Sequence, residues 1–127
     1  MPRILLIDDD SVLRDILRDV LESAGYQVAE AKDGNQGIDL LRAEGVAYDL
    51  IVTDVVMPGE SGMAVVKAAR THCPSTKILV ISGGSHDLPA KWSLKMTEMY
   101  GVEAVLFKPF QNDEFSDLVG KLLDQTA

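Results

Sequence analysis

The sequence predicts an α/β fold in which a doubly wound parallel sheet carries helices on both faces, and three observations support this prediction. Short apolar, β-branched segments recur along the chain and suit strands that are buried on both faces. Between them lie segments whose apolar residues recur every three or four positions, as in amphipathic helices. Strand and helix alternate throughout, which favours parallel strands joined by right-handed crossovers.

We expect strands and helices in equal number, five of each. The strands lie at residues 3–8, 27–31, 49–53, 77–81 and 102–107. The helices lie at 12–24, 35–44, 61–71 and 89–100, with a last one striped by Leu118, Val119, Leu122 and Leu123. Gly25 is a suitable end for the first helix, and the Gly83-Gly84 pair interrupts the chain after the fourth strand.

Length, charge and cysteine content restrict the functions that are open to the chain. Its 127 residues suit one hydrophobic core, so we expect residues 1–127 to form a single domain. The formal net charge of −8 repels nucleic acids and anionic lipids, so direct binding to either is not expected. No apolar run approaches a membrane span, and the lone Cys73 cannot form an internal disulfide. A soluble, cytoplasmic protein is the expectation.

Polar side chains follow four of the expected strands at the point where each strand ends. They are Asp8, Asp9 and Asp10 after the first strand, Asp54 after the third, Ser82 after the fourth and Lys108 after the fifth. In open parallel sheets these strand ends meet at the edge where ligands bind. The strand near residue 30 brings nothing comparable. Clustered carboxylates repel one another, and a hard divalent cation such as Mg²⁺ relieves that repulsion.

The same residues fit the chemistry of phosphoryl transfer. A phosphoryl group in transfer spreads negative charge over its oxygens, so it needs positioning and nearby cations more than covalent machinery. Lys108 and a divalent cation would supply positive charge, and Ser82 would donate a hydrogen bond. Asp54 is the best-placed carboxylate to act as the nucleophile.

Four short motifs stand at these strand ends in a fixed order. They are Asp8-Asp9, the segment Thr53 to Gly59 around Asp54, Ile81-Ser82-Gly83, and Phe107-Lys108-Pro109-Phe110. Each is weak alone, but together they resemble the response-regulator receiver family of two-component signalling, over essentially the whole chain. The resemblance implies the flavodoxin-like strand order 2-1-3-4-5 of chemotaxis regulators.

The resemblance also implies an acceptor and a metal site. Asp54 would be phosphorylated by a histidine kinase or a histidine phosphotransfer protein. Asp9 would bind Mg²⁺ directly, together with Asp54 and the backbone carbonyl of Val56, and Asp8 would assist, often through water. The protein would be a signalling domain that assists its own phosphorylation and dephosphorylation rather than an enzyme.

Further roles follow from the same resemblance. Ser82 would donate a hydrogen bond to the phosphoryl group, and Lys108 would form an ion pair with it. The bond between Lys108 and Pro109 would be cis. Phosphorylation would switch a surface made of the fourth helix, the fifth strand and the fifth helix, which would then bind a downstream protein.

Two features depart from the family pattern, and a third bears on the lifetime of the phosphoryl group, which varies within the family. Val105 stands where a tyrosine or phenylalanine is common, which puts an aromatic switch coupled to Ser82 in doubt. The stretch from Ser82 to Lys108 is a few residues longer than expected. Val56 and Gly84 cannot orient an attacking water with a side chain, so we expect slow self-dephosphorylation.

Two other functions remain open from the residues. The segment from Leu5 to Val12 also resembles the nucleophile motif of haloacid-dehalogenase-type phosphatases, in which Asp8 would be the nucleophile and Asp10 the general acid. The short chain and the absence of a late acidic pair oppose this reading, and Asp10 also suits a helix cap. A pseudo-receiver that works without phosphorylation is the other alternative. The combination of Asp9, Asp54 and Lys108 weighs against it.

Overall fold

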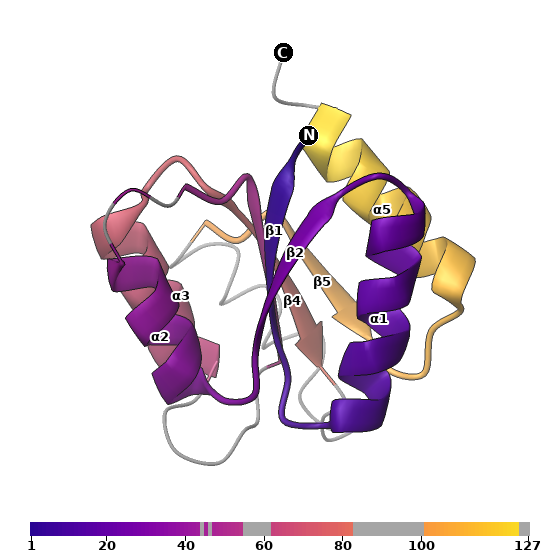
Figure 1. Cartoon of the computed structure of the whole chain (residues 1–127), viewed down its shortest axis with the longest axis horizontal. Coiled ribbons are helices and arrows are strands. Elements are labelled where there is room, and N and C mark those ends of the chain that lie inside the picture. The colour runs from indigo at the N-terminus through magenta and orange to yellow at the C-terminus, as the bar shows by residue number, and fades with distance from the viewer. Residues whose placement is uncertain (44, 46, 55–61, 83–100, 125–127) are drawn as a thin grey trace.

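Five parallel strands form one sheet, and helices of the described residues cover both of its faces, as Figure 1 shows. The computed structural model describes residues 1–43, 45, 47–54, 62–82 and 101–124. The strands are β1 (Arg3–Ile7), β2 (Gln27–Ala31), β3 (Leu50–Asp54), β4 (Lys77–Ser82) and β5 (Ala104–Phe107). The helices of the described residues are α1 (Ser11–Ser23), α2 (Gly34–Arg42), α3 (Gly62–His72) and α5 (Asn112–Asp124).

The strand order is β2-β1-β3-β4-β5 with every neighbouring pair parallel, so the predicted doubly wound fold is confirmed. The helix expected at 89–100 lies outside the described residues. Many element boundaries differ from expectation by one or two residues. Helix α2 begins at Gly34 because the side chain of Asp33 caps it by accepting the N–H of Gln36 at 2.8 Å. Regular pairing of β5 begins only at Ala104.

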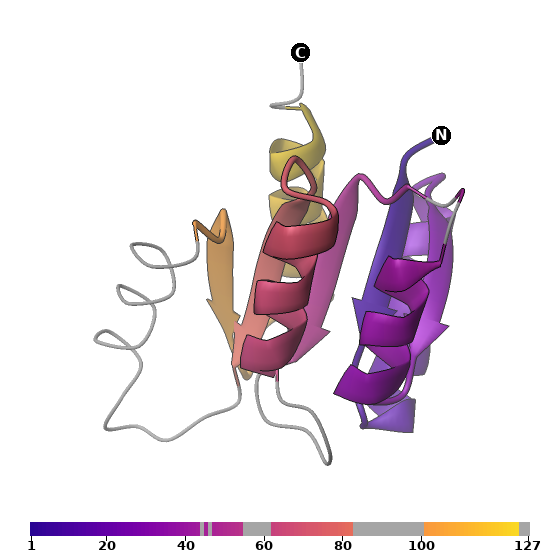
Figure 2. The same ribbon diagram turned by 90° about the vertical axis from the view of Figure 1, so that its left-hand side faces the viewer.

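The sheet separates two hydrophobic cores, because side chains alternate between the faces of each strand. From β1, Leu5 and Ile7 pack against α2 and α3, in what we call the α2/α3 core. Ile4 and Leu6 pack against α1 and α5, in the α1/α5 core, together with the fully buried Phe115. Figure 2 shows α2 and α3 side by side in front of the sheet. Both faces are therefore covered, as the apolar strands require.

All strands run in one direction, so the sheet has two chemically different edges. We call the edge where the strands begin the amino edge, and the edge where they end the carboxyl edge. In Figure 1 the arrowheads point toward the carboxyl edge, at the opposite end from the N-terminus. No helix in the described part of the chain is both long enough and apolar enough to cross a membrane.

Side-chain bonds close the amino edge. Arg70, near the end of α3, donates to the carbonyl oxygens of Thr76 at 2.9 Å and Gly101 at 2.6 Å, and forms an ion pair of 3.3 Å with Glu103. The same Glu103 oxygen accepts the N–H of Ile78 at 2.6 Å. Lys77 donates from Nζ to the carbonyl oxygen of Leu122 in the last turn of α5. These bonds join α3, β4, β5 and α5 where the strands begin.

Candidate metal and phosphoryl-transfer site

Asp8 is a buried carboxylate immediately after β1, with only 1% of its surface exposed. Its N–H continues the sheet by donating to the carbonyl oxygen of Ala31 at 3.1 Å. The N–H of Asp10 donates to Oδ1 of Asp8 at 2.9 Å and fixes the side chain. The other oxygen, Oδ2, is buried and has no hydrogen-bond partner within the described part of the chain. A buried carboxylate oxygen without a partner is costly and indicates a site for a ligand.

Asp10 has a structural role at the start of α1. Its Oδ1 accepts the N–H groups of Val12 at 3.1 Å and Leu13 at 3.2 Å, which is the geometry of an N-cap. The expectation that Asp10 caps this helix is confirmed. A side chain held in this way is poorly placed to act as a general acid, which argues against the phosphatase alternative.

Asp54 and Lys108 meet across the carboxyl edge. Asp54 is the last residue of β3 and is 6% exposed, and Nζ of Lys108 lies 3.0 Å from its Oδ2. Lys108 follows β5 directly, and its N–H donates to the carbonyl oxygen of Ser82 at 2.8 Å. Burial lowers the pKa of Lys108, but the hydrogen bond and charge of Asp54, with the charge of Asp8, outweigh it and raise the pKa above its usual value. Lys108 is therefore a cation at neutral pH.

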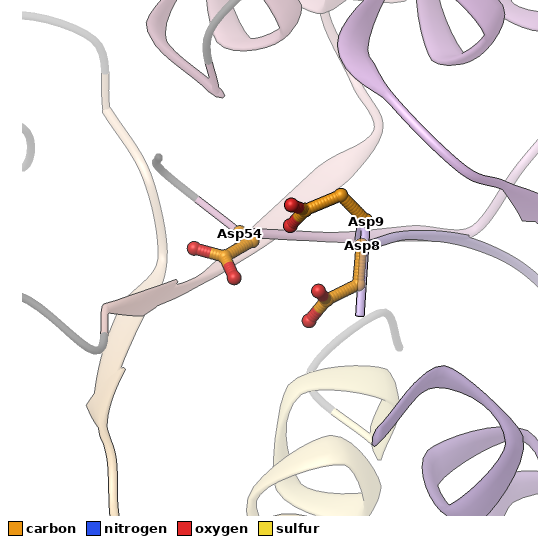
Figure 3. A group of neighbouring side chains, drawn as sticks. All are labelled: Asp8, Asp9 and Asp54. Carbon is orange, nitrogen blue, oxygen red and sulfur yellow. The ribbon is translucent and has the colours of Figure 1, made fainter. Parts of the chain in front are cut away.

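Three carboxylates gather between β1 and β3. Asp8, Asp9 and Asp54 each place one oxygen within 4.8 Å of the others, and Figure 3 shows the three side chains together beyond the strand ends. The pKa of Asp8 is raised to about 6. Burial is the main cause, and the charges of Asp54 and Asp9 also raise it, whereas the hydrogen bond from the Asp10 N–H and the charge of Lys108 lower it. Clustered oxygen ligands of this kind, one of them buried and unpartnered, fit a hard divalent cation.

The structure thus brings together most of the residues predicted for the site. Asp8, Asp9, Asp54 and Lys108 lie at one edge, and Ser82 ends β4, the strand between β3 and β5. Val56, the expected source of a carbonyl ligand, lies outside the described residues. The Lys108–Pro109 peptide bond is cis, as expected. Val105 is partly buried against the α2/α3 core.

Glu30 and Arg14 also lie near the site, and neither was predicted from the sequence to contribute to it. Glu30 lies on β2, the strand to which no chemistry was assigned, and its Oε1 lies 3.3 Å from Nε of Arg14. The guanidinium of Arg14 also donates to the backbone carbonyl oxygen of Asp8 at 2.7 Å. One signal was available, because a side chain in the first turn of a helix points back toward the preceding residues. The pairing with Glu30 depends on the strand order and could not be read locally.

Comparisons with known proteins agree with this geometry. The sequence model of the response regulator receiver domain matches residues 4–120. The transcriptional regulatory protein CpxR of Escherichia coli K12 is 36% identical over 115 residues, which are 90% of this chain and 46% of CpxR. The cell cycle transcriptional regulator CtrA of Caulobacter vibrioides is 34% identical over 113 residues, which are 88% of this chain and 46% of CtrA. The chain therefore spans about half the length of these curated relatives.

A solved structure shows the same similarity. The response regulator protein TrrA of Thermotoga maritima, in complex with Mg²⁺–BeF, superposes with a TM-score of 0.78 at 30% identity. The match covers 96% of this chain and 99% of TrrA. The likeness therefore extends over nearly the whole of both chains, including the strands that carry the clustered carboxylates.

Proposed function

This chain belongs to the response regulator receiver domain family, and we propose that Asp54 is its phosphoacceptor and that Mg²⁺ is its cofactor. The observation that carries the proposal is the position of Asp54, which lies between the ammonium group of Lys108 and the carboxylates of Asp8 and Asp9. A family of this kind receives phosphoryl groups in two-component signalling. The family match does not favour the phosphatase or the pseudo-receiver.

The proposed reaction transfers a phosphoryl group from a phosphohistidine of a histidine kinase or phosphotransfer protein. A carboxylate oxygen of Asp54 attacks phosphorus, the P–N bond of the donor breaks, and the imidazole leaves with the electron pair and takes up a proton. Lys108 orients the Asp54 carboxylate through the bond to Oδ2 and remains beside the phosphoryl oxygens. Ser82 donates a hydrogen bond to the transferred group.

The metal ligands in this proposal are Asp8, Asp9, Asp54 and the carbonyl oxygen of Val56. When bound, Mg²⁺ supplies positive charge that offsets the carboxylates and the phosphoryl oxygens. Asp8 contributes its buried, unpartnered Oδ2, and Asp9 contributes an exposed carboxylate. Most of the negative charge of the site is thereby compensated before the donor arrives.

The phosphorylated domain would then bind a downstream protein, and the phosphoryl group would be lost only slowly. We propose that residues 1–127 form one receiver domain, and that the signal passes to a downstream protein through the fourth helix, β5 and α5. Direct contact with nucleic acid is not part of this proposal, because the net charge of −8 opposes it. Val56 and Gly84 lack polar side chains that could orient water, so self-dephosphorylation should be slow.

The intact mass of the protein after incubation with acetyl phosphate tests the proposal. We expect a Mg²⁺-dependent phosphoryl adduct in the unaltered protein, none in Asp54→Asn, and much less in Asp8→Asn. An adduct that Asp54→Asn retains and Asp8→Asn loses would support the phosphatase alternative. No adduct in the folded, unaltered protein, from acetyl phosphate or from a phosphorylated histidine kinase, would favour a pseudo-receiver.

A further inference from the structure

We propose that Arg14, oriented by Glu30, is a positioning residue that fixes the turn carrying Asp8 and Asp9 and thereby sets the affinity of the site for a divalent cation. The inference rests on the proposed function, because it concerns the same metal site. It assigns a role to two residues that contact neither Asp54 nor Lys108 in the described bonds.

The contacts of Arg14 join three elements. From the first turn of α1, its NH1 donates to the carbonyl oxygen of Asp8 at 2.7 Å, and its Nε donates to Oε1 of Glu30 at 3.3 Å. Its side chain is only 17% exposed. A planar guanidinium presents several donors in a fixed fork and can serve both acceptors at once. Arg14 therefore holds α1, the end of β1 and β2 together.

Glu30 is a rigid anchor for this arginine. It lies within β2, where its register partner in β1 is Leu6. The backbone of Glu30 is therefore held by the sheet, and its carboxylate accepts hydrogen bonds from both Arg14 and Arg18. Because Glu30 accepts from Nε, the guanidinium of Arg14 is oriented so that NH1 reaches the carbonyl oxygen of Asp8.

The Asp8 carbonyl is an effective place from which to position both carboxylates. It belongs to the peptide unit that joins Asp8 to Asp9, so rotation of that unit changes the directions of both side chains. Asp8 is fixed on its other side by the N–H of Asp10, which binds Oδ1. Arg14 thus restrains the backbone between two proposed ligands, while Asp10 restrains the side chain of one of them. Restraints of this kind tune metal affinity without touching the ion.

The chain provides a matched control in Arg18, one turn further along α1. Arg18 also binds Glu30, at 3.2 Å, and forms ion pairs with Asp15 and Asp19. Its described contacts include no atom of Asp8. Replacing Arg18 removes an equal charge and a different contact to Glu30, and leaves the bond from Arg14 to the Asp8 carbonyl oxygen in place.

Loss of the Arg14 charge and loss of its restraint on the backbone should change the affinity for Mg²⁺ in opposite directions. Removing a positive charge beside a cation site should strengthen cation binding, because less repulsion remains. Releasing the Asp8–Asp9 peptide unit should weaken binding, because the ligands must be ordered when the ion binds. A weaker affinity in Arg14→Met therefore cannot be a simple charge effect.

The test is the dissociation constant of Mg²⁺ for the unphosphorylated chain, measured by isothermal titration calorimetry. We expect Arg14→Met to weaken binding about tenfold and Arg14→Lys about threefold, since lysine keeps the charge but cannot hold both acceptors. Arg18→Met should bind at least as tightly as the unaltered protein. Thermal unfolding without Mg²⁺ shows whether each variant is folded, and Arg14→Lys carries the test if Arg14→Met is not.

Several results would overturn the inference. Folded Arg14→Met or Arg14→Lys that binds Mg²⁺ as tightly as the unaltered protein would do so, and so would an equal loss in Arg18→Met. The acetyl phosphate assay separates this failure from failure of the proposed function. If Asp54 is phosphorylated normally but the Arg14 variants bind Mg²⁺ normally, only the positioning role is wrong. If the unaltered protein binds no Mg²⁺, the metal site and the positioning role are both wrong.

Discussion

The amino and carboxyl edges of the sheet both carry charged side chains, but they use them in opposite ways. At the amino edge, Arg70 donates to three backbone carbonyl oxygens and to the carboxylate of Glu103, and that carboxylate also accepts a backbone N–H. At the carboxyl edge, three carboxylates lie close together, Lys108 forms an ion pair with Asp54, and Oδ2 of Asp8 is buried without a partner among the described residues. The charged side chains of the amino edge therefore find their hydrogen-bond partners within the chain.

This difference separates stability from function within one sheet. Partly buried charges stabilise a fold when their hydrogen bonds are complete, and they destabilise it when like charges are left close together. The carboxyl edge therefore holds an unfavourable electrostatic arrangement that a bound cation can relieve. Changes at the amino edge should lower stability with little effect on metal binding. Removing a carboxylate at the carboxyl edge should weaken metal binding and stabilise the metal-free protein.

The largest expected effect comes from breaking the amino edge with Arg70→Met. The change leaves Glu103 and the carbonyl oxygens of Thr76 and Gly101 without their shared donor, so the free energy of unfolding should fall by about 3 kcal/mol in urea denaturation. The affinity for Mg²⁺ should stay within about twofold, because the lost contacts lie at the other edge.

Arg42→Met is the matched control for that change. Arg42 is exposed at the end of α2, and the described residues provide it with no ion pair or hydrogen bond, so its loss should cost less than about 0.5 kcal/mol. Equal losses of stability in both variants would mean that the bonds of Arg70 do not hold the amino edge together.

The second effect has the opposite sign, since Asp8→Asn should stabilise the metal-free protein. The folded-state pKa of Asp8, about 6, lies above the ordinary value of 3.8, so the folded state binds the proton more tightly than the unfolded state does. The stability that this proton contributes is complete below about pH 4 and is lost as the pH rises through about 6. At about pH 8 the asparagine variant should therefore be more stable by about 2 kcal/mol.

Urea denaturation across this pH range, without divalent cations, measures that difference. The advantage of Asp8→Asn should disappear near pH 4, where Asp8 itself is protonated. Asp10→Asn is the control, because asparagine caps a helix as well as aspartate does and should change stability by less than about 0.5 kcal/mol. A destabilised Asp8→Asn at about pH 8 would contradict the electrostatic account of the carboxyl edge.

Mg²⁺ should relieve the repulsion among the carboxylates at the carboxyl edge and thereby stabilise the folded protein. At a concentration about tenfold above its dissociation constant, the gain in the free energy of unfolding should be about 1.4 kcal/mol near pH 8. The gain should shrink near pH 5, where protonation of Asp8 competes with the cation. Thermal unfolding with Mg²⁺, and with KCl at the same ionic strength, distinguishes binding from screening. Equal shifts with both salts would exclude a specific site.

The smallest effect tests the packing of α2 against Ile7, the last residue of β1, next to the carboxyl edge. A Cβ atom at Gly37 of α2 would lie 2.6 Å from Cδ1 of Ile7, the fully buried residue before Asp8. Gly37→Ala should therefore lose about 1 kcal/mol, because overpacking outweighs the better helix propensity of alanine. Gly120→Ala in α5 meets nothing within 4 Å and should gain about 0.5–1 kcal/mol. Equal gains in both variants would show that Ile7 can move freely.

Local patterns in the sequence predicted the strands, the parallel sheet and the polar residues at the strand ends, whereas the strand order and the metal ligands came from the family resemblance. Strands β1 and β3 are buried along their whole length or nearly so, which is why their apolar runs are conspicuous in the sequence. Asp54 and Lys108 were predicted to lie close together by one rule, that parallel strands end at a common edge. That rule needs the strand boundaries but no tertiary contact, so it works from the sequence.

The contacts of Glu30 and Arg70 could not be predicted in the same way. Glu30 belongs to a strand that is mostly half-buried, so its charge resembles that of an ordinary solvent-facing residue. Its role depends on the direction in which the Arg14 side chain leaves α1. Arg70 binds Gly101 and Glu103, 31 and 33 residues away in the chain, so that contact exists only after the sheet has formed. Charged side chains with distant partners carry little local signal.

Because the sheet separates the α1/α5 core from the α2/α3 core, the two cores can diverge independently during evolution. Ile4 and Leu5 are adjacent in the chain, yet their side chains contact different helices. Energetic coupling between substitutions should therefore be strong within a core and weak across the sheet. One layer can be repacked, by drift or by design, while the other keeps the strand ends in register. The positions of the clustered carboxylates require both cores to be packed, but they do not require particular apolar residues in either core.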